Sequence, residues 1–423
     1  CKGVCSRILT LGRPDWRSPE AKTTTIGSPS EPIRRPIRLK PIGGPIPYSW
    51  QHPDWPHYRW DDRALLEPVA QLSEQRGRLL SELDALGLAD RTGIELEAFV
   101  GDALDTSVIE GQPLPPHSVR SSVAHRLGLE QGGVAPLRRD VEGLVQVLVD
   151  ATQGRDQPLT AERLWGWHAA LFPTGHSGID RIVVGGWRTT PIQVLSGVVG
   201  DERVHFAGPP PERVPGEVAA LLDWWRGPSV SLEGVQRAGI AHLWFETIHP
   251  FEDGNGRIGR AIADMALAQA EGTGTRVYSL SSQILEDRSE YYSALKTAQA
   301  GELDVTEWLV WFTGCVERAV RRGRTAVASA LVGSGIRTLA LATGMNDRQI
   351  KVVNKLIEAG RDGFEGGLNN RKYRGMTGAS KATATRDLAE MERRGLLVRG
   401  ISGGRSTGFQ LNWDVCEHTT PAP

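Results

Sequence analysis

Residues 249–257 read HPFEDGNGR, and they directly follow the largely apolar stretch VQRAGIAHLWFETI at 235–248. The apolar residues of that stretch recur at helical spacing, which predicts a helix. Pro250 disfavours the α conformation for His249 and so ends this helix. The glycines that follow permit a tight turn, and a second helix is expected from about Gly256. The sequence therefore predicts a helix, a short polar loop and a second helix.

The same loop contains the spacing of a dinucleotide-binding fingerprint. Gly254, Gly256 and Gly259 spell GxGxxG, but that fingerprint must follow a strand inside a βαβ unit. Here it follows a predicted helix. A Walker loop is also excluded, because no Gly-Lys-Ser/Thr sequence follows. The glycines must serve another purpose.

The residue types in the loop suit the binding of a triphosphate. A glycine-rich turn at a helix N-terminus presents backbone N–H groups to an anion. Arg257 and Arg260 lie three residues apart on one helix face, where their guanidinium groups can hold phosphate. Asp253 or Glu252 can bind Mg²⁺, and His249 can accept a proton from an incoming hydroxyl. The alternative is that His249 only caps a helix and that the charges are solvated.

The sequence HPFEDGNGRIGR resembles the HPFx(D/E)GNGRxxR signature of the Fic-domain family at every fixed position. The resemblance implies that the loop binds Mg-ATP and that AMP is transferred to a Ser, Thr or Tyr hydroxyl of a target protein. His249 is then the catalytic base and Asp253 the Mg²⁺ ligand. The resemblance also implies that Asn255 and the amides of Gly254 and Gly256 hold the α-phosphate of ATP. Arg257 and Arg260 would then hold the outer phosphates. Glycine and arginine at positions 254 and 257 favour AMP transfer over the phosphate transfer of the Doc branch.

Other stretches extend the resemblance over about residues 48–415. GGWRTTPIQVLSG and VHFAGPPPERVP, within 179–206 and just beyond, look like the Fic flap, a hairpin that aligns the target by strand addition. EYYSALKTAQAGELDVTEWLVWF looks like the helices that close the fold. Within it, Tyr291 or Tyr292 is expected near the adenine or, alternatively, in the packed core. YSWQHPDWPHYRWD resembles the N-terminal extension of large bacterial Fic proteins.

TSVIEG at 106–111 fits the family's inhibitory pattern (S/T)xxxE(G/N), with Thr106 and Glu110 at its fixed positions. Glu110 is expected at the C-terminal end of a helix, where the helix dipole disfavours a carboxylate. Such an acid needs a cation, and Arg260 is the one that the family pattern supplies. We therefore expect a Glu110–Arg260 pair and inhibition in cis; the alternative is that the helix simply ends on a polar residue.

The remaining sequence indicates a mostly α protein: a Fic-type helical bundle with an inserted β-hairpin flap and a C-terminal winged helix-turn-helix domain. No apolar run approaches the length of a membrane-spanning helix, and the four scattered cysteines predict neither a disulfide framework nor structural zinc, so the cytoplasm is the expected location. We predict these divisions of the chain: a disordered Pro/Arg-rich leader at 1–48, an N-terminal helical extension at 49–115, the catalytic domain at 116–322, a linker at 323–345, the winged helix at 346–415 and a tail at 416–423.

The C-terminal region is basic. Residues 346–411 hold 13 Lys/Arg against 7 Asp/Glu, a difference of +6. In SKATATRDLAEMERRGLLV an apolar stripe is expected on one helix face, with Arg386 and Arg393 on the other, and LLVRGISGGRSTGFQL is expected to form a hairpin. This pattern is similar to a winged helix that binds DNA. Protein docking or homodimerisation is the alternative.

These observations predict a protein adenylyltransferase that uses Mg-ATP to modify a target protein and itself. One alternative is a DNA-binding regulator that uses the Fic domain as a nucleotide sensor; the intact base His249 argues against it. A second alternative is removal of AMP by the same site, with Glu110 orienting a water.

Overall fold

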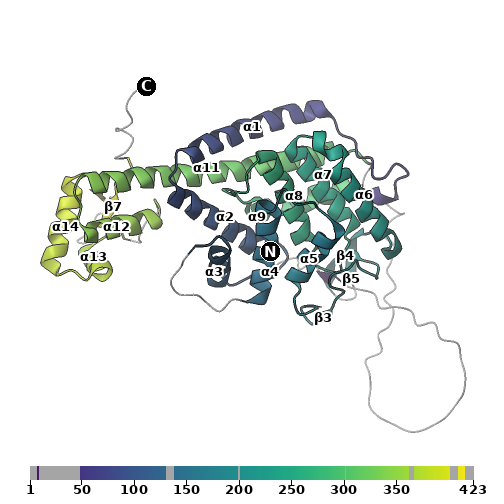
Figure 1. Ribbon diagram of the computed structural model, residues 1–423, viewed down its shortest axis with the longest axis horizontal. Helices are drawn as coiled ribbons and strands as arrows, with labels where there is room; N and C mark the ends of the chain where they lie inside the picture. Colours follow the sequence, from purple (N-terminus) through teal and green to yellow (C-terminus); the bar gives the residue numbers. More distant parts are fainter. Residues whose placement is uncertain are drawn as a thin grey trace, which may run out of the picture. The chain divides into compact units, whose positions relative to one another are not determined.

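The protein is mostly helical (Figure 1). The computed structural model describes residues 7–8, 48–129, 138–198, 201–300, 302–361, 366–400 and 408–414, without the side chains of 7–8 and 194–205. The chain divides into two compact units. The first contains Cys1–Arg76 and Glu95–Val320, and the second contains Gly77–Ile94 and Arg321–Pro423.

The first unit is built around the pair α7 (Gly234–Ile248) and α8 (Asn255–Glu271), which lie side by side in Figure 1. From Val235 to Ile248 all residues of α7 except Arg237 are buried. A helix that is apolar on all sides belongs in a protein core. Other helices surround this pair: α2 (Leu88–Ile109), α3 (Pro116–Arg126), α4 (Arg139–Gln153), α5 (Ala161–Leu171), α6 (Val214–Arg226), α9 (Leu280–Glu286) and α10 (Arg288–Ala300).

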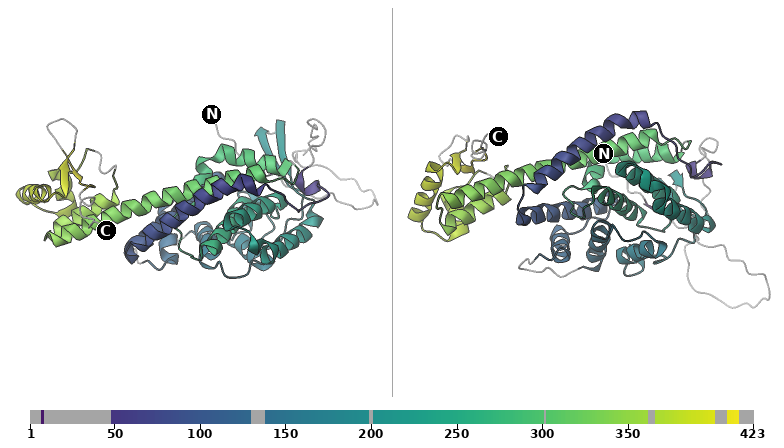
Figure 2. Two further views of the ribbon diagram at one scale, coloured as in Figure 1. Left: turned by 90° about the horizontal axis from the view of Figure 1, so that it is seen from above. Right: turned by 45° about the horizontal axis from the view of Figure 1, so that its top comes forward.

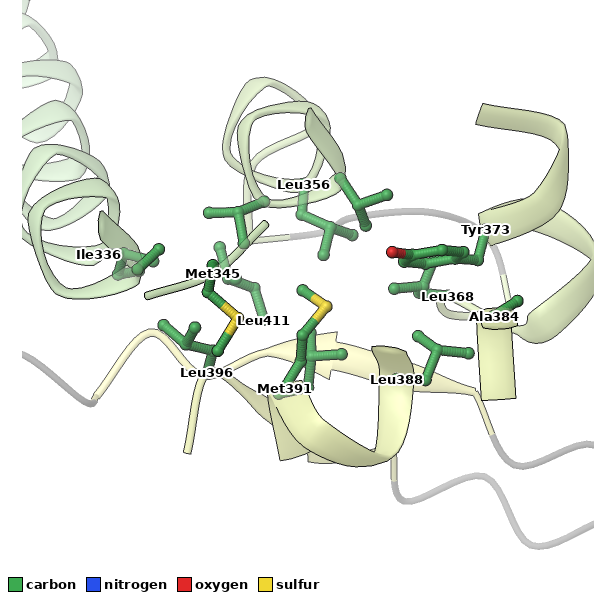
Figure 3. Packing of buried hydrophobic residues seen from close by; sticks show 14 residues of the cluster. Ile336, Met345, Leu356, Leu368, Tyr373, Ala384, Leu388, Met391, Leu396 and Leu411 are labelled. Atoms are coloured by element: carbon green, nitrogen blue, oxygen red, sulfur yellow. The ribbon is translucent and has the colours of Figure 1, made fainter. Parts of the chain in front are cut away.

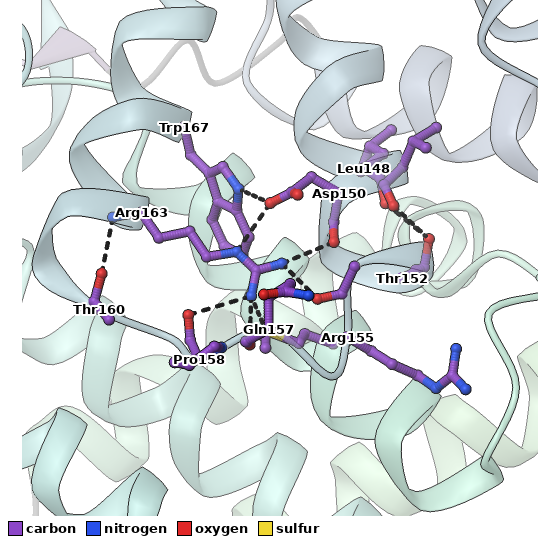
Figure 4. Close-up of polar contacts among 12 residues, drawn as sticks. Leu148, Asp150, Thr152, Arg155, Gln157, Pro158, Thr160, Arg163 and Trp167 are labelled. Carbon is purple, nitrogen blue, oxygen red and sulfur yellow. Dashed lines mark hydrogen bonds and ion pairs between the residues drawn. The ribbon is translucent and has the colours of Figure 1, made fainter.

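A polar brace joins α4 to α5 (Figure 4). The Asp150 carboxylate accepts hydrogen bonds from Arg163 Nε at 2.9 Å and from Trp167 Nε1 at 2.7 Å. The Thr160 hydroxyl caps α5 by accepting from the backbone N–H of Arg163. This brace fixes α5, whose last turn carries His168 toward the loop between α7 and α8.

The inserted strands lie between α5 and α6. The strands β2 (His176–Ser177) and β3 (Asp180–Arg181) form one small antiparallel pair, and β4 (Gln193–Val198) pairs with β5 (Asp201–Ala207) in another. The predicted hairpin at 179–206 is therefore present, although its regular pairing is confined to its second half. Within the predicted disordered leader, Arg7–Ile8 form strand β1, which adds to β4. For these two residues the prediction of disorder is wrong; the rest of 1–47 lies outside the described residues.

The predicted linker at 323–345 is wrong, because α11 (Thr306–Ala342) continues through most of it as one helix in both views of Figure 2. Its alanine, leucine and arginine residues are strong helix formers, it lacks proline, and its scattered glycines are tolerated. The ends of α11 and of the predicted linker also contribute Ile336, Ala340 and Met345 to the core of the second unit, so this unit begins well before residue 346.

The second unit also takes residues 77–94 from the predicted N-terminal extension at 49–115, which is therefore not one unit. These residues include the end of α1 (Asp62–Asp84) and the start of α2. Within the second unit Arg324 of α11 binds Glu82, and Arg337 is paired with Asp90.

The second unit is a small helical domain with a two-stranded sheet. Its elements follow in the order α12 (Asp347–Glu358), α13 (Asn370–Thr377), α14 (Lys381–Arg393), β6 (Leu397–Arg399) and β7 (Phe409–Leu411). The expected apolar stripe of α14 is buried: Ala384, Leu388 and Met391 lie in the core drawn in Figure 3. The turn of the predicted hairpin, 401–407, and the tail from 415 on lie outside the described residues.

The expectation that no stretch is apolar enough to span a membrane does not hold for α11. By length and composition alone this helix could cross one, and 22% of its most apolar 18-residue window is buried. The core helix of a soluble protein passes the same test.

Candidate active site

The loop between α7 and α8 has the predicted helix–loop–helix setting. α7 ends at Ile248, and His249 adopts a left-handed conformation with φ of 51°, alone among the non-glycine residues in the described parts of the chain. This conformation is held by Arg188, whose Nε donates to the His249 carbonyl at 2.7 Å and whose Nη2 donates to the Pro209 carbonyl at 2.5 Å. A left-handed residue that is fixed from outside is typical of functional sites.

The turn itself is closed by Asn255. Its side-chain oxygen accepts from the Phe251 N–H at 2.9 Å, and its side-chain nitrogen donates to the Phe251 carbonyl at 2.8 Å. Gly254 has φ of 81°, and a Cβ there would come within 2.8 Å of Phe172. Both polar groups of the Asn255 side chain thus form hydrogen bonds within the loop. Its contribution to the predicted phosphate cradle would therefore come from its backbone N–H.

The His249 ring is arranged as a base. Its Nδ1 lies 3.3 Å from the Glu246 carbonyl, so this nitrogen carries the hydrogen and donates it. Nε2 is buried and has no hydrogen-bond partner among the described residues. Burial and the nearby Arg188 lower the pKa of His249 to about 4, so the ring is neutral near pH 7. A neutral ring with a free Nε2 lone pair can accept a proton.

Asp253 and Glu252, the two alternatives for a metal ligand, have different surroundings. Glu252 is buried, and its carboxylate accepts from the Val183 N–H at 2.9 Å and from the Thr190 hydroxyl at 3.4 Å. Asp253 lies 3.8 Å from Arg257 Nη2 and accepts from the Gly254 N–H. Among the described residues no three His, Cys, Asp or Glu side chains form a metal cage. Mg²⁺ is commonly held by one carboxylate together with substrate phosphates and water, and Asp253 fits that donor set.

Thr106 and Glu110 both bind Arg260. The Arg260 side chain is 1% exposed; its Nε donates to the Thr106 hydroxyl at 2.8 Å, and its Nη2 donates to Glu110 Oε1 at 2.6 Å. Burial raises the pKa of the Glu110 carboxyl, but Arg260 and Arg257 outweigh burial, and the net pKa is lowered. The predicted pair is therefore present as a true ion pair.

The Glu110 carboxylate also occupies the N-terminus of α8. A Cβ on Gly256 would collide with Glu110 Oε1. The first N–H groups of a helix have no acceptor within it and attract anions. Nearby, Nε and Nη2 of the buried Arg257 have no hydrogen-bond partner among the described residues. The carboxylate thus lies in an anion site that is only partly filled.

The two candidate adenine contacts separate. Tyr291 is buried, and its hydroxyl lies 3.0 Å from His242 Nε2 among the rings of Trp308 and Trp311. Tyr292 is 40% exposed beside Arg288. Tyr291 therefore packs in the core, whereas Tyr292 remains open to solution.

Two residues of the site were missed from sequence. Arg188 fixes the His249 backbone from a segment some 60 residues away in the chain, and His168 stacks on Phe251 while its Nε2 lies 3.2 Å from the Asp253 carbonyl. Burial lowers the pKa of His168 to about 4. The sequence around neither residue indicates its role, because each acts through a contact with a distant segment of the chain.

Comparison with known proteins finds sequence similarity in the region that contains this loop. Residues 158–267 match the Fic/DOC family, and residues 48–129 match a domain of unknown function, DUF4172. A probable protein adenylyltransferase of Aquifex aeolicus is 35% identical over 143 residues, which are 34% of this chain and 36% of that protein. The protein adenylyltransferase Fic of Nematostella vectensis is 24% identical over 259 residues, 60% of this chain and 55% of that protein. The chain thus spans about half or less of the length of these relatives.

Solved Fic structures are also similar. A Fic family protein from Desulfovibrio desulfuricans matches with a TM-score of 0.48 and 20% identity, over 82% of this chain and 95% of that one. Fic-1 from Caenorhabditis elegans matches with a TM-score of 0.46 and 20% identity, over 64% of this chain and 75% of that one. The match to the Fic/DOC family at residues 158–267 contains the whole α7–α8 loop.

Proposed function

We propose that the Fic domain is a protein adenylyltransferase, which transfers AMP from ATP to a hydroxyl of a target protein and of the protein itself, and that Glu110 inhibits it in cis. The observation that carries this proposal is the Glu110 carboxylate at the N-terminus of α8, paired with Arg260. One anion already lies where the helix terminus and two arginines could hold phosphate. The named adenylyltransferases among the relatives support the same activity.

In the proposed reaction His249 Nε2 takes the proton of the target hydroxyl. The hydroxyl oxygen forms a bond to the α-phosphorus of ATP, the bond from that phosphorus to the β-phosphate oxygen breaks, and pyrophosphate leaves. The N–H groups of Gly256 and its neighbours would hold the α-phosphate, and Arg257 and Arg260 the outer phosphates. Asp253 would hold Mg²⁺, which neutralises phosphate charge when bound.

Inhibition follows from the shared use of one guanidinium. While Glu110 binds Arg260 Nη2, this arginine is not free to grip the terminal phosphate. ATP could enter with its phosphates out of line for attack, so inhibition would act on geometry more than on affinity. Removal of Glu110 should therefore activate the protein.

The experiment is transfer of labelled AMP by wild type, Glu110→Gly and Glu110→Gly/His249→Ala. We expect Glu110→Gly to transfer far more label than wild type, and the double variant to transfer almost none. Label that survives in the double variant would place the chemistry at another residue. Loss of label from a modified acceptor, instead of transfer, would favour removal of AMP.

We further propose that the second unit is a winged helix that binds DNA through α14. Arg386 is exposed and has no hydrogen-bond or ion-pair partner within the described part of the chain, and Arg393 is 74% exposed. Both point away from the buried stripe of α14, and positive charge on one helix face suits a phosphate backbone. Concentration-dependent dimerisation without DNA binding would favour the docking alternative.

A further inference from the structure

Glu246 is a buried acid directly behind the proposed base. It lies one turn before His249 on α7, its side chain is 7% exposed, and its Oε2 is 3.8 Å from His249 Nδ1. Its Oε1 is buried without a hydrogen-bond partner among the described residues. A buried carboxyl that lacks full hydrogen bonding costs stability, so it calls for an explanation.

The facing helix leaves room for this carboxyl. A Cβ on Gly259 of α8 would approach Glu246 Oε1 to 2.6 Å and His242 Nδ1 to 3.2 Å. Any larger residue at 259 would push the carboxyl away from its place. Glycine at this point of contact between α7 and α8 thus accommodates a carboxyl beside the His249 ring.

We infer that Glu246 is a positioning residue, which orients the His249 ring through Nδ1 and offsets the positive charge that the ring gains when Nε2 takes the target's proton. This inference rests on the proposed adenylyl transfer. The two nitrogens of the ring face opposite tasks: Nδ1 faces the main chain and carboxyl of Glu246, and Nε2 is free. A carboxylate at this distance, shielded from water, stabilises an imidazolium ring.

The charge of Glu246 is linked to Glu110. Burial first and Glu110 second raise the pKa of Glu246 to about 8, whereas Arg260 lowers it. The other titratable groups that face Glu246 are His242 and His249 on its own helix and Tyr291 on α10. While Glu110 is docked, the Glu246 carboxyl keeps its proton near pH 7; removal of Glu110 takes away one negative neighbour and favours the ionised form. Release of Glu110 would then have two effects at once: it would free Arg260 to bind phosphate, and it would make His249 a stronger base by favouring the ionised form of Glu246.

The test is the pH profile of self-AMPylation by the full-length protein with labelled ATP, in the Glu110→Gly background. An ionised Glu246 raises the pKa of His249, so Glu246→Gln should lower the plateau rate about tenfold or more and move the acid limb of the profile to lower pH. Glu246→Asp keeps the charge, so it should lose rate but keep the limb near that of the parent.

Glu217→Gln is the matched control. Glu217 is a buried acid of the same unit, and its carboxylate binds Arg213 and Trp55 rather than His249. The Glu217→Gln variant should leave both the plateau rate and the acid limb unchanged. Because ATP titrates equally in all these assays, the profile of this variant also shows how much of the acid limb comes from ATP itself. Thermal melting of each variant monitors folding. If Glu246→Gln does not fold, the pH profile of Glu246→Asp decides the question. This variant keeps the carboxylate, so an acid limb that moves to lower pH in it, as expected for loss of the charge, contradicts the inference.

The outcomes separate the two proposals. If the Glu110→Gly parent transfers no AMP, or transfers it equally well after His249→Ala, the proposed function fails. If the parent depends on His249 but Glu246→Gln keeps its rate and its acid limb, only the role of Glu246 is refuted. A lower rate with an unmoved limb in both Glu246 variants means that the residue merely packs.

Discussion

The first turns of α8 and the exposed face of α14 both present pairs of arginines, but in opposite surroundings. Arg257 and Arg260 are 7% and 1% exposed, and Arg260 is already held by Thr106 and Glu110. Arg393 on α14 is 74% exposed. Buried guanidinium groups in a fixed place suit one small, highly charged ligand, because their orientation is settled before the ligand arrives. Exposed ones suit an extended polyanion, for which position matters less and salt matters more.

The largest effect should come from His249, the group that distinguishes the loop from a mere anion site. In the Glu110→Gly background, His249→Ala should reduce AMP transfer by about 10²–10⁴-fold, because a general base is lost and no neighbour replaces it. ATP affinity, measured by calorimetry, should change only a few fold. Near-normal transfer would remove His249 from the role of base.

The next effect concerns the buried arginine. In the Glu110→Gly background, Arg260→Ala should reduce transfer by about tenfold to a hundredfold, since charge-assisted bonds to phosphate are lost. In the wild-type background it should not imitate Glu110→Gly, although it also breaks the ion pair. Arg386→Ala is the control from α14 and should leave transfer unchanged. Activation by Arg260→Ala would contradict the phosphate clamp.

A smaller effect is expected from the exposed arginines. The full-length Arg386→Ala/Arg393→Ala variant should bind duplex DNA more weakly than wild type. If each arginine contacts one phosphate, the slope of log affinity against log salt should fall by about 2. Fluorescence anisotropy over a salt series measures it. Equal slopes for the two proteins would leave α14 without a role in DNA binding.

The smallest effect concerns the pH dependence of folding stability, and it comes from the buried carboxyl of Glu246. Between its ordinary pKa of 4.5 and about 8, Glu246 keeps its proton when folded and loses it when unfolded. Wild type should therefore lose stability as pH rises through this range, by at most about 1.4 kcal/mol per pH unit. Glu246→Gln removes this pH-dependent loss of stability. The melting temperature of the variant relative to that of wild type should therefore rise between pH 5 and pH 8. A constant difference across that range would argue against a buried neutral carboxyl.

The sequence was most informative where structure is local. Pro250 and the glycines at 254 and 256 determine the end of α7 and the start of α8 through backbone conformation alone, and the residues between them are the ones to which we assign the proposed chemistry. The Glu110–Arg260 pair spans 150 residues, and only the combination of a family pattern with an unfavourable helix end made it predictable.

Two features could not be predicted because they depend on packing. Arg188 was overlooked because nothing near it in sequence indicates that its guanidinium supports the His249 carbonyl. The predicted linker at 323–345 is wrong because α11 runs through most of it, and Ile336 and Ala340 of this segment are buried in the second unit. Tertiary contacts override such weak local preferences.

The most direct test of the central claim is AMP transfer by wild type and Glu110→Gly, at saturating Mg-ATP and with ATP affinity measured in parallel. We expect a sharp rise in transfer with only a small change in ATP affinity, because the proposed effect of Glu110 is to keep Arg260 from the terminal phosphate more than to block the entry of ATP. Equal transfer by the two proteins would mean that Glu110 merely ends α2. This result would contradict the proposed inhibitory role of Glu110.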